Sequence, residues 1–155
     1  MSLLRVSWAA GRDMSRFRST FERVLEVARR VAASRVVLEL DALPDISPYD
    51  QAWLATQWMP RAVELPLEQV VIVLSPRRIY NHQVVEGLLF MARPFIHFDV
   101  QFFSQSIPAL RWISDYSPLV PGLLAEWDAA FGPAGLAPGT GNAAEQRASY
   151  GYDQA

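Results

Sequence analysis

The sequence predicts an α/β fold: a four-stranded, largely parallel sheet with helices packed on it. Four short apolar or alternating segments are spaced along the chain, and each is followed by a segment whose apolar residues recur at helical spacing. Helices between consecutive strands imply right-handed crossovers, which place neighbouring strands parallel. The 155 residues, of which 51% are hydrophobic, suit one domain with a sizeable core.

The first strand is predicted at residues 4–8, where Leu4, Val6 and Trp8 alternate with polar residues. A glycine and an aspartate then turn the chain into the first helix. The apolar residues of that helix fall on one face, while its charged residues lie mainly on the others and indicate a solvated surface. This apolar face consists of Phe17, Phe21, Val24, Leu25, Ala28, Val31 and Ala32.

The second strand is predicted at residues 36–40, an apolar run interrupted by one glutamate. The following helix begins with Ser47 as its N-cap and a proline at its first helical position, and Asp50 lies near the positive end of the helix dipole. Pro60 has no N–H group to donate, so the helix is predicted to kink or stop near Met59. Its apolar side consists of Trp53, Leu54, Trp58 and Ala62.

The third strand is predicted at residues 70–74, a continuous apolar run that is typical of a strand covered on both faces. Ser75 and Pro76 repeat the cap-and-proline pattern and predict another helix directly after this strand. Pro94 is expected to end that helix. Its apolar face consists of Val85, Leu88, Leu89 and Ala92.

The fourth strand is predicted at residues 96–103, where apolar and mostly polar residues alternate, a pattern that suits the edge of a sheet. Short helices are predicted near residues 107–114 and 123–131. Five of the eight glycines lie from residue 132 onward, where apolar periodicity ends. The sequence therefore predicts an α/β domain at 1–131 and a flexible Gly/Pro/Ala-rich tail at 132–155. In the alternative interpretation, Tyr150 and Tyr152 dock this tail onto the domain.

The composition excludes several kinds of chemistry. All 14 basic residues are arginines, so lysine-dependent catalysis is absent, and without cysteine there is no disulfide or thiolate chemistry. The net charge is -2 with no basic tract, which gives no support for nucleic-acid binding. No secretory signal or membrane-spanning stretch is recognised, so we expect a soluble cytoplasmic protein, and we expect no cofactor.

Two groups of polar residues follow the second strand, at the end of the sheet where α/β proteins tend to build their sites. Ser47 has two interpretations, a helix cap or a phosphorylation site at a helix start. The acidic loop residues Asp41 and Asp45, together with Asp50, offer oxygen ligands for a divalent cation. Their spacing matches no EF-hand and no glycine lies between them, so an ordinary loop with a helix cap explains them better.

A third group follows the third strand and is the best candidate for small-ligand binding. Two arginines near a helix start are suited to hold a carboxylate or phosphate, although solvent-exposed side chains are the simpler interpretation. The group consists of Arg77, Arg78, Tyr80, Asn81 and His82. The two histidines of the chain do not make a metal site. Surplus aromatic residues form a candidate partner surface if they are not core: Trp53, Trp58, Phe90, Phe95 and Phe103.

The chain resembles the SpoIIAA/STAS-like proteins, and among them small uncharacterised bacterial members. The resemblance covers roughly residues 3–113 and is most specific in its middle. It is carried by Trp8 at the end of an early strand, Phe17 and Arg18 at a helix start, and Asp50, Gln51, Trp53, Leu54, Trp58, Pro60, Arg61 and Ala62. Two features differ from the family: the first strand of its usual β-hairpin is absent, and the residues around Ser47 do not match the phosphorylated motif of sigma-factor regulators.

The resemblance implies a non-enzymatic protein-interaction or regulatory domain that self-associates. The missing hairpin strand implies an open sheet edge at residues 3–8, so a homodimer through that edge, or another protein as the partner, is expected. The alternative is a small-molecule or lipid-binding module that uses the helix N-termini at Ser47 and Ser75. An unrecognised enzyme is the third hypothesis.

Overall fold

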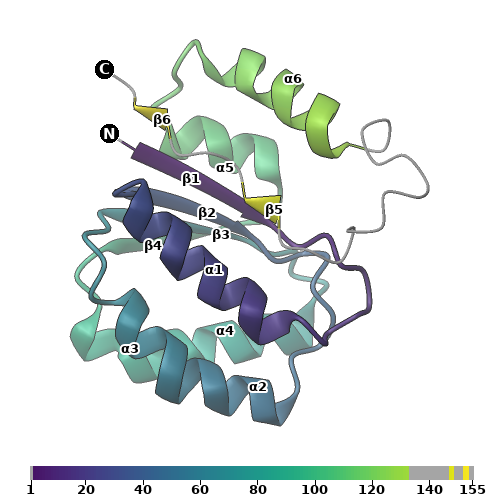
Figure 1. The fold of residues 1–155 in the computed structure, drawn as a ribbon, viewed down its shortest axis with the longest axis vertical. Coiled ribbons are helices and arrows are strands. Elements are labelled where there is room, and N and C mark those ends of the chain that lie inside the picture. Colours follow the sequence, from purple (N-terminus) through teal and green to yellow (C-terminus); the bar gives the residue numbers. More distant parts are fainter. Residues whose placement is uncertain (1, 133–146, 149–151, 154–155) are drawn as a thin grey trace.

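The computed structural model describes residues 2–132, 147–148 and 152–153 (Figure 1). Its sheet has the order β4-β3-β2-β1-β5, with β6 also paired to β1. Four parallel strands form the body of the sheet, which confirms the predicted α/β class. They are β1 (Ser2–Ser7), β2 (Arg35–Glu39), β3 (Gln69–Val73) and β4 (Asp99–Phe103).

The helices lie in two layers, one on each face of the sheet (Figure 1). Because the strands follow one another across the sheet in chain order, right-handed crossovers place all the connecting helices on the same face. These are α1 (Phe17–Arg30), α2 (Pro48–Trp53), η1 (Leu54–Trp58), α3 (Met59–Ala62) and α4 (Ile79–Ala92), which runs into the short η2 (Arg93–Phe95). The opposite face carries α5 (Ser106–Ile113) and α6 (Val120–Phe131).

Alternation along the central strands divides the apolar interior into two cores. Val70 and Ile72 of β3 belong to the larger core beneath α1, η1 and α4, whereas Val71 and Val73 belong to the smaller core beneath α5. All four are buried. The prediction that this strand is covered on both faces is therefore confirmed.

The helix after β2 continues through Pro60 to Ala62, so of the two outcomes predicted near Met59, a kink or a stop, the stop does not occur. The segment Leu54–Trp58 adopts a π-helical turn, and α3 then extends to Ala62. The N–H of Met59 donates to the carbonyl of Leu54, and the Arg61 guanidinium donates to the carbonyl of Gln57 at 2.7 Å. A wider turn before Pro60 and a side-chain donor after it thus accompany the proline within the helix.

The helix after β3 begins later than predicted. Residues 75–78 form a turn, closed by a bond from the Arg78 N–H to the Ser75 carbonyl at 3.0 Å, and α4 starts only at Ile79. The Ser75 hydroxyl accepts from the Arg77 N–H at 3.2 Å, so it stabilises the turn and is not the N-cap of α4.

The two edges of the sheet differ. β4 forms one edge, as its alternating sequence predicted. At the other edge β1 pairs antiparallel with β5 (Arg147–Ala148) and β6 (Tyr152–Asp153), within the segment where the sequence predicted a flexible tail, with docking as the alternative. The edge of β1, which the sequence predicted to be unpaired, is therefore paired at these positions. Residues 133–146, 149–151 and 154–155 of the same segment lie outside the described residues.

Candidate functional site

The polar residues predicted as site residues meet at the carboxyl ends of β2 and β3. Asp41 follows β2 and Ser75 follows β3, and the Asp41 carboxylate accepts a hydrogen bond from the Ser75 N–H at 2.7 Å. This bond joins the two loops across neighbouring strands. The acid is thereby used in fixing the loops to each other.

Asn81 is the most deeply buried member of the predicted ligand-binding group, with 1% of its surface exposed. Its Oδ1 accepts from the Ile46 N–H at 3.0 Å, and its Nδ2 donates to the carbonyls of Leu43 and Pro44 at 3.0 and 2.9 Å. All three partners belong to the loop after β2. Asn81 therefore holds that loop against α4, with its amide directed at the chain's own backbone.

Tyr80 and Arg78 fasten the same loop. The Tyr80 hydroxyl donates to the Ile46 carbonyl at 3.0 Å and accepts from the Gln51 side chain at 2.9 Å. The Arg78 guanidinium donates to the Leu43 carbonyl and lies 3.9 Å from the Asp45 carboxylate. Arg77 is exposed beside them. The donor groups of Arg78 and Tyr80, which the sequence predicted would hold an anion, thus bind backbone carbonyls of the chain itself.

The start of α2 satisfies its own polar groups. The Ser47 hydroxyl accepts from the Asp50 N–H at 3.1 Å, which is the geometry of an N-cap. The Asp50 carboxylate lies 3.0 Å from the Arg18 guanidinium of α1. Asp41, Asp45 and Asp50 therefore have separate partners, and the described residues include no group of three or more acids or histidines that could hold a metal ion.

The two histidines lie in different parts of the molecule. The His82 ring stacks on Phe102 with centroids 5.0 Å apart, and its Nδ1 lies 3.2 Å from the Glu86 carboxylate. His97 precedes β4, and its Nε2 lies 3.0 Å from the Val63 carbonyl at the end of α3. Each histidine connects secondary-structure elements, and the two do not form a common site.

An ion pair that the sequence analysis missed lies beneath α6. The Arg5 guanidinium lies 2.7 Å from the Glu39 carboxylate on the neighbouring strand, and both side chains are nearly buried. The Trp127 ring of α6 lies 4.2 Å from the same guanidinium, a cation–π contact. Glu39 was the one charge within an apolar strand, and this was the signal available in the sequence.

An exposed apolar surface lies on α4 and η2, and the sequence analysis predicted part of it, Phe90 and Phe95. Phe90, Met91 and Phe95 expose 73%, 61% and 70% of their surface. By contrast Trp58 is buried and Trp53 is partly buried, so these two predicted partner residues contribute mainly to the core. A groove of about 760 Å³ separates α4 from α2 and η1 beside this surface.

Comparison of the chain with protein-family models, with curated proteins and with solved structures found no match in any of the three. Among the described residues, every helix is too short or too polar to cross a membrane.

Proposed function

We propose that this chain is a non-enzymatic STAS-like interaction domain that self-associates through β4 and the apolar surface of α4 and η2. The observation that carries the proposal is the combination of a sheet edge with large exposed apolar side chains next to it. Phe90, Met91 and Phe95 lie in the segment that leads directly into β4. An unpaired edge strand offers N–H and C=O groups to another chain, and exposed apolar area adds the hydrophobic contribution.

The polar groups around the loop after β2 favour an interaction domain over an enzyme. The Asn81 amide, the Tyr80 hydroxyl and the Arg78 guanidinium are used to fix that loop to α4. A nucleophile, base or anion-binding group would have to be free to meet a substrate. A rigid loop of this kind instead supports a surface of fixed shape.

We propose the opposite edge of the sheet, and not the edge predicted from the sequence, as the place of self-association. β1 is paired with β5 and β6, whereas β4 has β3 as its one strand partner among the described residues. In an antiparallel pairing of two copies about Gln101, Val100 lies opposite Phe102, and Asp99 lies opposite Phe103. This register brings apolar residues together and keeps the two aspartates apart.

Sedimentation at micromolar concentration tests the proposal. We expect the unmodified chain to be a symmetric dimer and the double variant Phe90→Ser, Phe95→Ser to be a monomer with unchanged circular dichroism, because both side chains are already exposed. The matched control is Ile107→Ser, an exposed apolar residue on the opposite helical layer, which should remain dimeric. A clean monomer for the unmodified chain would remove the dimer hypothesis.

The alternative function, small-molecule or lipid binding at the helix N-termini of Ser47 and Ser75, has less support than self-association. The Ser47 hydroxyl is engaged by the Asp50 N–H, and Ser75 lies in a turn that precedes the start of α4. Ligand binding at these two helix starts therefore has little support. Small-molecule binding is better supported at another location in the molecule.

A further inference from the structure

The larger core contains a cavity of about 90 Å³ between the sheet and the layer formed by α1, η1, α3 and α4. Its floor consists of the alternate side chains Val36, Leu38 and Leu40 of β2 and its neighbouring loop, beside Val70 and Ile72 of β3. These residues extend along the full length of both strands. The space therefore follows the strand direction.

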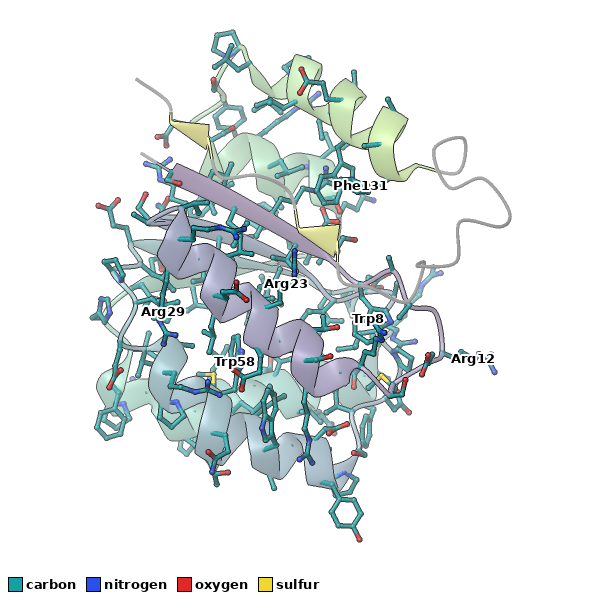
Figure 2. The ribbon with its side chains drawn as sticks, viewed as in Figure 1. Trp8, Arg12, Arg23, Arg29, Trp58 and Phe131 are labelled. Atoms are coloured by element: carbon teal, nitrogen blue, oxygen red, sulfur yellow. The ribbon has the colours of Figure 1, made fainter. Side chains whose placement is uncertain are left out.

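The cavity lining offers no partner to a water molecule. The lining side chains are aliphatic or aromatic apart from the thioether of Met59, and the one N–H group among them, Trp58 Nε1, donates to the Phe21 carbonyl at 2.7 Å. Figure 2 shows Trp58 in the helical layer beside α1. Because a buried water needs two to four polar partners, the space is either dry or occupied by carbon.

One side of the lining is incompletely buried. Met59, Leu88, Leu89, Phe98 and Val100 are only partly covered, whereas the lining residues of β2, β3 and α1 are buried. The partly covered residues belong mostly to α4 and to the chain around β4. An apolar molecule can therefore approach the cavity between these two elements.

The π-helical turn lies over this cavity. Leu54 and Trp58, the first and last residues of η1, both line it. Isolated π turns inside helices are often found at functional sites, where the wider turn changes the position of side chains. The unusual helix geometry and the unfilled volume thus coincide.

We infer that this cavity binds the end of a linear alkyl chain, which enters between α4 and β4. The volume is well below the roughly 150 Å³ of an apolar cavity that holds benzene, so it suits a short alkyl segment and not a large ring system. The lining recognises the ligand by the absence of polar groups, so the inserted part is neutral. The head group of the ligand stays outside the cavity.

Methyl NMR of alanine-labelled protein, titrated with 1-butanol, 1-hexanol and 1-octanol, tests the inference. Ala28 and Ala62 line the cavity, whereas Ala129 is exposed on α6. We expect saturable shifts of the first two methyl signals and none at Ala129. Because a cavity of this volume is filled by the end of the chain, affinity should change little from 1-butanol to 1-octanol, whereas continued burial would raise it about fourfold for each added methylene.

The variant Ala62→Leu adds side-chain volume at the cavity wall and should abolish the shift of the Ala28 signal. Ala129→Leu makes the same change at an exposed position and should leave that shift intact. Equal shifts at buried and exposed alanines, or no saturation up to the solubility limit, would overturn the inference. The titration of the unmodified chain decides the matter alone, so the test still works if Ala62→Leu fails to fold. The test is also independent of the proposed self-association, because a monomer would contain the same cavity.

Discussion

Asn81 shows how a residue that resembles a ligand contact serves the fold. We expect Asn81→Ala to lower the free energy of unfolding by about 3 kcal/mol, because the Ile46 N–H and the Leu43 and Pro44 carbonyls lose their buried partner. Urea unfolding measures the loss. Gln83→Ala, an exposed amide on the same helix, is the control and should change stability by less than about 0.5 kcal/mol. Equal losses in both variants would contradict this role for Asn81.

Ser47 has a smaller effect of the same kind. We expect Ser47→Ala to reduce the free energy of unfolding by about 1 kcal/mol, because the Asp50 N–H loses its acceptor, while Ser47→Asp should be close to neutral because aspartate also caps helices. Urea unfolding of the three proteins decides between the two interpretations of this serine. Unchanged stability of Ser47→Ala, combined with loss of self-association, would favour a role in regulation.

Glu22 and Arg61 link α1 to α3 through two hydrogen bonds of 2.7 and 2.5 Å. The hydrogen bonds from Arg61 hold the pKa of Glu22 below its ordinary value of 4.5. A depressed carboxylate pKa contributes stability that is complete above the unfolded-state pKa and is lost as the pH falls through the folded-state pKa. The pair should therefore stabilise the fold at neutral pH and lose this contribution below about pH 4.5.

Urea unfolding of the unmodified chain and of Glu22→Gln, measured from pH 7 to pH 3, checks this expectation. The two proteins should differ most at neutral pH and converge in acid. A difference in stability that is constant across this range would show that Glu22 acts through packing and not through its charge.

At the scale of elements, the sequence predicted the four parallel strands well because apolar alternation depends directly on which face of the sheet is buried, but it did not predict β5 and β6. Helix starts were less reliable. Ser47 and Ser75 have the same serine-proline signature, yet the first caps a helix and the second stabilises a turn. The difference comes from tertiary contacts. The chain after Ser75 first places Arg78 and Asn81 against the loop after β2, and the local sequence does not encode that contact.

The π turn shows the same limitation. Pro60 correctly indicated a disturbance of the helix, but not its form, because a π turn before it and a bond from the Arg61 side chain to the Gln57 carbonyl accompany the continued helix. The predicted site residues were found close together because the carboxyl ends of β2 and β3 are neighbours. Their roles were not predictable, since the backbone carbonyls that Asn81 and Arg78 contact become available only after the loop has folded.

For the whole molecule, a chain that ends at Phe131 should retain its fold. Both cores are formed by earlier elements, and β5 and β6 contribute four residues to the sheet. We expect the melting temperature to fall by no more than ~4 °C, the shift produced by about 1 kcal/mol in a domain of this size. A larger decrease in a thermal unfolding experiment would assign residues 132–155 to the domain.

The same truncation should increase self-association, because the outer edge of β1 then has no strand partner. Sedimentation compares the two chain lengths at equal concentration. The variant Phe90→Ser, Phe95→Ser separates the two edges: in the shortened chain it should leave any association through β1 intact. An unchanged sedimentation profile after truncation would show that β5 and β6 do not control access to this edge.

The order of the strands has a consequence for the folding kinetics. Each parallel pair joins strands that are consecutive in the chain, so each pairing closes a loop of one crossover and the entropy cost is similar at every step. β1 and β5, by contrast, come from opposite ends of the sequence, and their pairing closes a loop that includes nearly the whole chain. Contacts of such high sequence separation form slowly and late. The central sheet can therefore assemble while the outer edge of β1 is still unpaired. During this interval two incompletely folded chains can associate through that edge.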